Sequence, residues 1–394
     1  MPGVRALQTL IDARMGEVRA TIRKNLALIG FALLCTMGAV RGGYGRLSLS
    51  AVARCLPTGG TQKTRYKRLG RFLDNKHFCP EAMVPALTSV VVGRVTARKS
   101  RLVPILVDQT DVAGIPTIMA GALFRGRILP LAFTCFEYAK IRKSQNSIET
   151  ALLALIIASL PPEVRAIFTA DRAYGRYQLL HALNDLGQLY VLRCKNSVAL
   201  RHDGKKRFPK DFKAPPGQAV RYSQVLYRDQ GQEPVDLIVY HEPQFKETWY
   251  LLVPPGSEKT LPTEQVVRLY RSRMRIEQGF RDWKTHLGVR GLKLESNPAV
   301  RMGRLLLAFA LAYICLLLLG AHDQVQENRL RFETLRRTPR HGTQRTLSVL
   351  SHAMLSLATP DFARKARRLL FDILAALTRG DCAYHDELSL DPAL

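Results

Sequence analysis

One segment of the sequence carries four reactive side chains at a spacing that a helix would align. Within residues 261–294, a phenol, a guanidinium, a carboxylate and an ammonium lie at i, i+3, i+7 and i+14: Tyr270, Arg273, Glu277 and Lys284. At about 100° per residue, these offsets fall within an arc of about 60° on one helix face. A carboxylate flanked by cations suits a site for a divalent metal and a phosphodiester. A solvated helix face with an i, i+4 pair between Arg273 and Glu277 is the alternative.

Two aspartates stand at the ends of apolar runs upstream of this segment. Residues 102–107 are followed by Asp108, and residues 164–169 are followed by Ala170 and Asp171. Both runs predict buried strands with a carboxylate at the tip. Asp111 is close to Asp108 in the chain and is an alternative to it, although an odd step along a strand should point it to the opposite face.

The elements between and after these strands predict an α/β sheet. Strand-like runs cover residues 112–119, 127–136 and 189–194, and a helix is expected at residues 175–186. Another helix is expected to be capped at Ser147, with Glu149 in its first turn, and to run through Leu160. The order is therefore β-β-β-α-β-α-β. Chemistry in such sheets lies at the carboxyl ends of adjacent parallel strands.

The spacing Y-x2-R-x3-E-x6-K at residues 270–284 resembles the Y-R-E-K signature of DDE transposases encoded by bacterial insertion sequences. In that family the glutamate is the third metal-binding carboxylate. V-D-x-T at residues 107–110 and A-D-R-x-Y at residues 170–174 resemble the sequences around its first and second catalytic carboxylates. The resemblance spans about residues 45–320. It implies an RNase H-like mixed sheet flanked by helices, with the first and fourth strands side by side.

The resemblance also implies a site and a reaction. Asp108, Asp171 and Glu277 would hold two Mg²⁺ ions about 4 Å apart, for which Mn²⁺ could substitute. The reaction would be cleavage at transposon ends and transfer of the strand into target DNA. The partners would be the terminal inverted repeats, target DNA and a second copy of the chain in a synaptic homodimer, in the bacterial cytosol with the nucleoid. A nuclease of the same fold without strand transfer and a domesticated DNA-binding descendant are the alternatives.

Composition independently indicates a polyanionic partner. The chain has 394 residues, with 59 Lys and Arg against 32 Asp and Glu, and a net charge of +27. Such an excess is expected of a protein that grips nucleic acid. The seven cysteines are scattered and form no C-x2-C pair, so neither a disulfide framework nor a zinc site is indicated.

The N-terminal region concentrates this charge. Residues 18–73 contain 11 Lys or Arg and no acidic residue. A short helix at residues 48–57, a turn at residues 58–60 and a basic helix at residues 61–73 predict a helix-turn-helix. The cations expected to contact DNA, specifically or through phosphates alone, are Lys63, Arg65, Lys67, Arg68 and Arg71. Arg172, which follows Asp171, is also assigned to DNA.

Residues 196–250 interrupt the predicted core with a different kind of sequence. Strand-like runs at residues 221–228, 235–241 and 248–253 resemble the β-rich insertion of the same transposases. Trp249 stands where the family carries an aromatic residue that receives a flipped base; core packing is the alternative. The predicted organisation begins with an N-terminal DNA-binding region at residues 1–95. A catalytic core follows in two pieces, at residues 96–195 and 251–325, with the insertion at residues 196–250 between them. A C-terminal helical region covers residues 326–394.

Two apolar runs test a membrane interpretation. Residues 26–40 and 305–319 are each shorter than the ~20 residues that span a bilayer, so both predict buried helices and no membrane partner. A basic membrane-associated protein built around the second run is the alternative from a different class. Residues 326–394 are predicted to be helical, and contacts with DNA or with a second copy both remain open.

Overall fold

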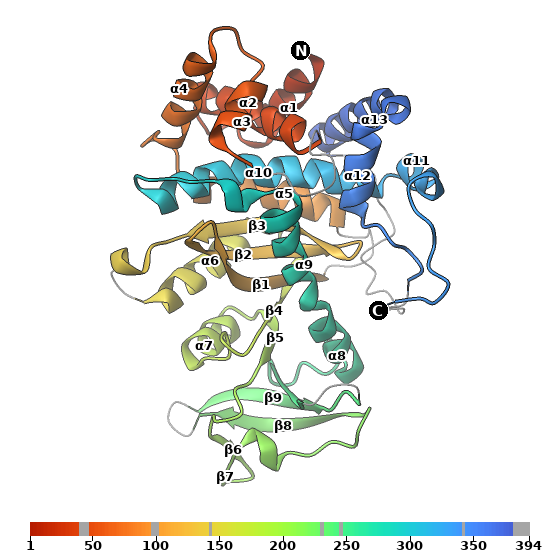
Figure 1. Cartoon of the computed structure of the whole chain (residues 1–394). Coiled ribbons are helices and arrows are strands. Elements are labelled where there is room, and N and C mark those ends of the chain that lie inside the picture. The colour runs from red at the N-terminus through yellow and green to blue at the C-terminus, as the bar shows by residue number, and fades with distance from the viewer. Residues whose placement is uncertain are drawn as a thin grey trace.

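In the computed structural model, a mixed sheet extends from the middle of the molecule to the end opposite the N-terminal helices (Figure 1). The structure describes residues 1–38, 47–95, 102–141, 144–228, 232–243, 247–340 and 343–380. In these ranges the sheet has ten strands, in the order β3-β2-β1-β4-β5-β10-β9-β8-β6-β7. The strands are β1 (Leu102–Val112), β2 (Ile115–Phe124), β3 (Arg127–Cys135), β4 (Arg165–Ala170), β5 (Leu189–Arg193), β6 (Leu200–His202), β7 (Lys205–Arg207), β8 (Ala219–Tyr227), β9 (Glu233–Tyr240) and β10 (Trp249–Val253).

Helices flank this sheet and gather at one end of it (Figure 1). Those beside the sheet are α5 (Val84–Val95), α6 (Gln145–Ser159), α7 (Tyr177–Asp185), α8 (Thr263–Ser272), α9 (Met274–Arg281) and α10 (Pro298–Ala321). The others are α1 (Pro2–Arg14), α2 (Ala20–Gly38), α3 (Leu49–Cys55), α4 (Gln62–Leu73), α11 (Asp323–Gln326), α12 (Val349–Ala358) and α13 (Pro360–Arg379). The expected α/β class, a mixed sheet flanked by helices, is confirmed.

The first and fourth strands are neighbours, as the sequence predicts. β1 pairs in parallel with β4, and the last pair in this ladder joins Val107 to Ala170. Asp108 and Asp171 are the next residue on each chain, so the topology brings two aspartates to one place. β5 continues the parallel part beyond β4, while β2 and β3 pair antiparallel on the other side of β1.

Three expected boundaries were wrong. β1 does not end at Val107 but continues to Val112, because its antiparallel partner β2 supplies hydrogen bonds beyond the end of β4. The second strand therefore begins only at Ile115, after a turn at Ala113 and Gly114 with φ of 52° and 86°. α6 begins at Gln145 after Ser144; the Ser147 hydroxyl donates to the Ser144 carbonyl oxygen instead of capping the helix.

The strands expected at residues 221–228, 235–241 and 248–253 are β8, β9 and β10. β10 pairs antiparallel with β5, so these strands extend the same sheet. The division of the chain into four regions stays a prediction. Its last 14 residues, 381–394, lie outside the described residues, as do residues 39–40 of the first apolar run.

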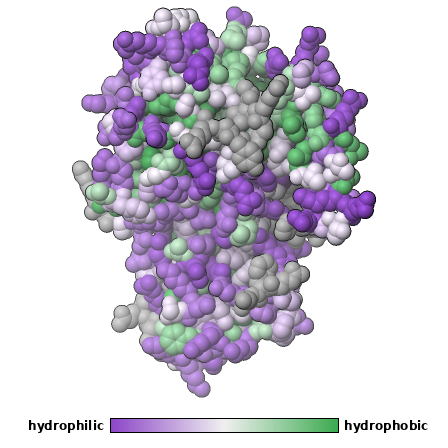
Figure 2. Space-filling view, viewed as in Figure 1, coloured by the Kyte–Doolittle hydropathy of each residue, from purple (hydrophilic) through white to green (hydrophobic). Residues whose placement is uncertain are grey.

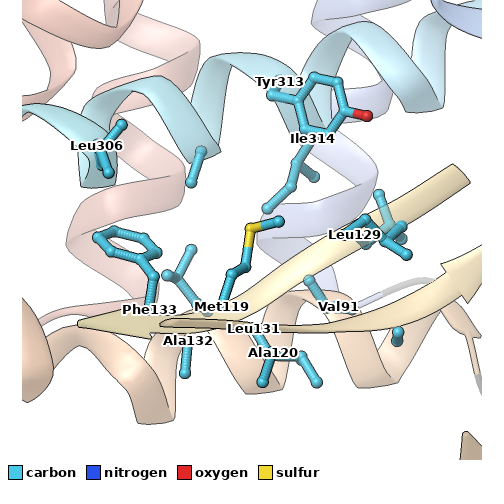
Figure 3. Packing of buried hydrophobic residues seen from close by; sticks show 14 of the residues in the cluster. Val91, Met119, Ala120, Leu129, Leu131, Ala132, Phe133, Leu306, Tyr313 and Ile314 are labelled. Carbon is cyan, nitrogen blue, oxygen red and sulfur yellow. The ribbon is translucent and has the colours of Figure 1, made fainter. Parts of the chain in front are cut away.

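The long apolar helix α10 forms the centre of the core. Among the described residues, α2 and α10 are long and apolar enough to cross a membrane by length and composition, but the α10 segment is 100% buried and that of α2 56%. Met119 and Phe133 point from the sheet toward Ile314 and Leu306 of α10 (Figure 3). Hydrophilic side chains cover most of the face seen in Figure 2, and its apolar patches gather over the helical end. The expected buried helix at residues 305–319 is confirmed.

Close packing fixes α9 against the sheet at Gly279. A Cβ at Gly279 would lie 2.7 Å from Ile128 Cγ1 of β3. We expect Gly279→Ala to lower the free energy of unfolding by about 1–3 kcal/mol through overpacking. Gly70 in α4 has open space around the same position, so Gly70→Ala should instead stabilise the protein by about 0.5–1 kcal/mol. Urea unfolding of both variants measures the two effects.

The Ile128→Ala background supplies the control for this pair. Removing the contacting side chain should make Gly279→Ala less damaging by about 1 kcal/mol or more, a coupling between neighbours that a double-mutant cycle reports. Equal effects of Gly279→Ala in both backgrounds would show that this contact does not hold α9 in place.

Candidate active site

Asp108 lies in β1 beside the end of β4 and is largely buried. Its Oδ1 accepts from the Gln109 backbone N–H at 2.8 Å, and its Oδ2 accepts from Arg273 Nη1 at 3.2 Å. The pKa of Asp108 is raised to about 6, mainly by burial and also by the charges of Asp171 and Glu277, while Gln109 and Arg273 oppose the shift. The three predicted carboxylates are therefore close enough to interact electrostatically.

Asp171 begins a loop that the sheet holds closely. Its Oδ1 accepts from the Ala173 backbone N–H at 2.8 Å. A Cβ at Gly175 would lie 2.5 Å from the Arg193 carbonyl oxygen, so only glycine lets the loop approach β5. Tyr174 is buried in the same loop, and burial raises the pKa of its hydroxyl, with Asp108 and Asp171 adding to the shift. Arg172 is exposed beside Asp171.

Residues 261–294 were expected to form a single helix, and this expectation was wrong because the segment is divided. It consists of α8, α9 and a π-helix, Asp282–His286, and α8 and α9 are divided at Arg273. A buried ion pair holds the π-helix in place, in which Arg127 Nε of β3 lies 2.7 Å from Asp282 Oδ2. The Tyr313 hydroxyl donates to the same Asp282 oxygen at 2.9 Å. π-Helical turns often mark functional sites, and this one sets the direction of Lys284.

Arg273 joins two of the carboxylates. Its Nη2 donates to Glu277 Oε1 at 2.9 Å, which is the i, i+4 pair expected for an ordinary charged helix. The same guanidinium also reaches Asp108 through Nη1, across 165 positions of sequence. The pair is thus part of a three-residue bridge between helix and sheet.

The four signature residues lie near one another. Arg273, Glu277 and Lys284 lie on the side of Asp108, and the Lys284 ammonium lies 5.9 Å from the centre of the Phe280 ring. Tyr270 is buried and its ring meets Trp249 edge to face at 5.0 Å; burial raises the pKa of its hydroxyl, and the charges of Arg193 and Arg273 oppose this shift. Trp249 is half-buried in this aromatic cluster, so the structure shows packing for both rings; a role in DNA binding stays a prediction.

A cleft of about 440 Å³ opens between β1 and α9. Its lining residues are Asp108, Gln109, Thr110, Glu277, Phe280, Arg281, Lys284, Thr285 and Arg290. Arg281 and Arg290 are cations that the sequence interpretation missed. Arg281 follows Glu277 by one helical turn, which is a usable signal, whereas Arg290 lies beyond the helix, where periodicity says nothing.

The predicted helix-turn-helix is formed by α3 and α4. Ser48 and Thr61 cap these helices through hydrogen bonds from Ala51 N and Thr64 N. Two of the five predicted DNA contacts are used inside the protein: Arg65 donates to the Arg54 carbonyl oxygen and Arg68 to Asn25 Oδ1. Lys63, Lys67 and Arg71 are exposed at i, i+4 and i+8, on one face of α4.

Comparison with known proteins identifies the family. Residues 113–314, more than half of the chain, match the family described as the transposase DDE domain. The chain belongs to this transposase family. The matched range includes Asp171 and Glu277 and begins just after Asp108. No curated protein matches the chain.

One solved structure resembles the transposase over most of its length. It is a cryo-EM structure of a piggyBac transposase synaptic complex with hairpin DNA. The TM-score is 0.46 at 11% sequence identity, and the likeness covers 96% of this chain and 83% of that one.

The donor chemistry of the transposase site fits a hard divalent cation, which DDE transposases use. Carboxylate oxygens are the ligands that Mg²⁺ and Mn²⁺ prefer. In the part of the chain that the structure describes, however, no three Asp, Glu, His or Cys side chains come close enough to hold one ion. Arg273 lies between Asp108 and Glu277 and offsets one of their two negative charges, so a metal has to compete with its guanidinium.

The charge of Asp108 should oppose folding of the metal-free transposase. Its folded pKa, about 6, lies above the ordinary 3.8, so the folded protein binds this proton more tightly than the unfolded chain. The penalty is absent below about pH 4, grows with pH and is complete above about pH 6. Because Asp108→Asn also removes a partner of Arg273, we expect a net gain of about 1–2 kcal/mol at pH 7.5. Urea unfolding in EDTA measures it.

The same measurement at pH 4.5 is the control, since most of the penalty is gone there in the wild-type protein. The gain should shrink by half or more between pH 7.5 and pH 4.5. An equal gain at both values, or a loss at pH 7.5, would mean that ionisation of Asp108 is not what Asn removes.

Proposed function

We propose that this chain is the transposase of a bacterial insertion sequence. It binds the terminal inverted repeats of its element, cleaves DNA strands there and joins them to target DNA. The observation that carries the proposal is the bridge from Asp108 through Arg273 to Glu277, with Asp171 acting on the same carboxylate, at a cleft that also contains cations. Membership of the transposase family supports it.

We assign Asp108, Asp171 and Glu277 as ligands of two Mg²⁺ ions, for which Mn²⁺ can substitute. Bound divalent ions would supply an activated water or 3′-hydroxyl and charge stabilisation for the leaving oxygen. Asp108 is ionised above about pH 6, so the site is ready for a cation at neutral pH. Lys284 binds a phosphate oxygen as a point charge, and Arg273 holds the two carboxylates near each other and in reach of the cleft.

DNA outside the cleft is held by other surfaces. The exposed face of α4, with Lys63, Lys67 and Arg71, contacts the phosphates of the repeat, and Arg172 contacts the strand beside Asp171. Trp249, which is half-buried against Tyr270, provides a ring surface against which an unpaired base can stack. The working form is a homodimer that pairs two transposon ends in the bacterial cytosol, with the nucleoid.

Removing any one carboxylate should abolish strand cleavage. Asp108→Ala, Asp171→Ala and Glu277→Ala are each expected to lower the cleavage rate by at least 10³-fold, because the ligands serve chemistry. Binding to a repeat-end duplex should change less than about threefold, because the basic surfaces serve affinity. Cleavage of a labelled end in Mg²⁺ and gel-shift binding in Ca²⁺ measure the two effects.

Asp111→Asn is the matched control. Asp111 lies in the same hairpin, is exposed and accepts from the Gly114 backbone N–H at 2.7 Å, so its variant should cleave normally. Retention of more than a tenth of wild-type cleavage by Asp171→Ala would remove that residue from the site. Cleavage by the wild-type protein without any strand transfer would favour a nuclease of this fold.

The charge on α4 should determine how binding depends on salt. If Lys63, Lys67 and Arg71 each contact a phosphate, replacing all three by Gln should make the slope of log K against log salt less negative by about 2.7. Filter binding between 50 and 300 mM NaCl measures the slope.

A charge-matched triple variant tests whether position matters. Arg5, Arg19 and Lys24 are exposed on or beside α1 and α2, and their replacement by Gln removes the same net charge. For this variant, the slope of log K against log salt should change by less than about 1. Equal changes for both variants would mean that total charge, not the α4 face, holds the DNA.

A further inference from the structure

We propose that Arg290, Arg281 and Lys284 form a second phosphate subsite in the cleft, which holds the phosphate next to the scissile one on the strand being cut. The proposal rests on the proposed function and deepens it. Arg281 and Arg290 lie within residues 261–294 but are not among the four signature residues, and both enter through the geometry of the cleft.

The charges that line the cleft do not balance. Its acidic residues, Asp108 and Glu277, already share the guanidinium of Arg273. The cations Arg281, Lys284 and Arg290 line the same cleft, and within the described ranges no ion pair joins any of them to an acid. Three cations facing one partly enclosed space repel one another unless an anion lies between them.

Two of these cations act directly on each other. The pKa of Lys284 is lowered by burial and then by the charge of Arg290, while Asp111 and Asp108 only partly offset this. Arg281 lies one turn before Lys284 on the same helical segment and is exposed. The three side chains therefore approach one region from two separate elements.

Arg290 stands on a rigid base, although its side chain is exposed. It belongs to the 3-10 turn Val289–Gly291, which follows Gly288 at a φ of 72°. Val289 and the flanking Leu287 and Leu292 are buried. The Leu47 backbone N–H donates to the Gly288 carbonyl oxygen at 3.0 Å. A turn fixed on both sides can present a guanidinium with little loss of freedom on binding.

The donors suit a phosphodiester better than a carboxylate. Two guanidinium groups offer paired N–H donors, an ammonium adds a point charge, and the hydroxyls of Thr110 and Thr285 line the same cleft. At about 440 Å³ the cleft has the size of a small-ligand site, which leaves room beyond one phosphate at the carboxylates. Successive phosphates of one strand supply two such anions in fixed order.

The test combines protein variants with neutral backbone linkages. Full-length Arg290→Ala should lower kcat/KM for a pre-nicked repeat end about 10- to 100-fold and make the salt slope less negative by about 1. One methylphosphonate linkage, adjacent to the scissile phosphate, should lower wild-type cleavage to the same extent. That linkage should have no further effect on Arg290→Ala, whereas neutral linkages elsewhere should act equally on both proteins.

Arg281→Ala is measured on the same substrates, so that the test does not depend on the folding of one variant. The melting temperatures of both variants should lie within about 2 °C of that of the wild type. Lys259→Ala removes an exposed cation that does not line the cleft and should behave as wild type. If every neutral linkage lowers cleavage by wild type and Arg290→Ala alike, the subsite is wrong while the transposase function stands. If wild type cleaves no repeat end, the proposed function itself fails.

Discussion

Two carboxylates from distant parts of the chain share a single guanidinium, and the architecture of the site depends on this bridge. Asp108 belongs to the sheet and Glu277 to α9, and without a cation between them their charges would repel. Arg273 is itself buried; burial disfavours its charge, but Tyr270, Asp108 and Glu277 more than compensate, so that its pKa is raised. The bridge thus holds α9 to the sheet and keeps the negative charges of Asp108 and Glu277 close together, where the proposed divalent cation would bind.

The frame beneath the bridge is apolar and tightly packed, which is why the charged residues keep their places. Gly279 lets α9 approach β3, and Trp283 fills the space between Phe133 and Phe309, with ring centres 6.3 and 5.1 Å away. The ion pair of Arg127 and Asp282 is buried in this layer. A buried ion pair contributes little net stability, but loss of one partner strongly destabilises the protein. The pair therefore favours one arrangement of the π-helix over others.

Apolar runs in the sequence mark the buried strands, and the family resemblance implied that the first and fourth lie side by side. Because adjacent parallel strands end at one edge, these two together predicted the meeting of Asp108 with Asp171. The sequence was insufficient where a distant partner decides the outcome. β2 extends β1 past Asp108, and the division at Arg273 accompanies its contact with Asp108. Glu149 is buried because Arg176, from another element, pairs with it. Arg290 could not be found because a turn has no periodicity. Tyr270 lies in α8, before this division, and packs against Trp249 of β10.

The N-terminal helices are joined to the same frame, and this bears on how DNA would be presented. Arg304 of α10, itself buried, donates to the carbonyl oxygens of Leu73 and Phe78 at 2.6 and 2.8 Å, and Arg301 pairs with Asp74 at 3.2 Å. These contacts hold the C-terminal end of α4, and a buried carbonyl left without its donor would be destabilising by about 1–3 kcal/mol. A duplex on α4 would therefore meet the cleft at a fixed offset. If DNA binds α4 and is cut in the cleft as proposed, a shift of the bound sequence along α4 would displace the scissile phosphate from the carboxylates.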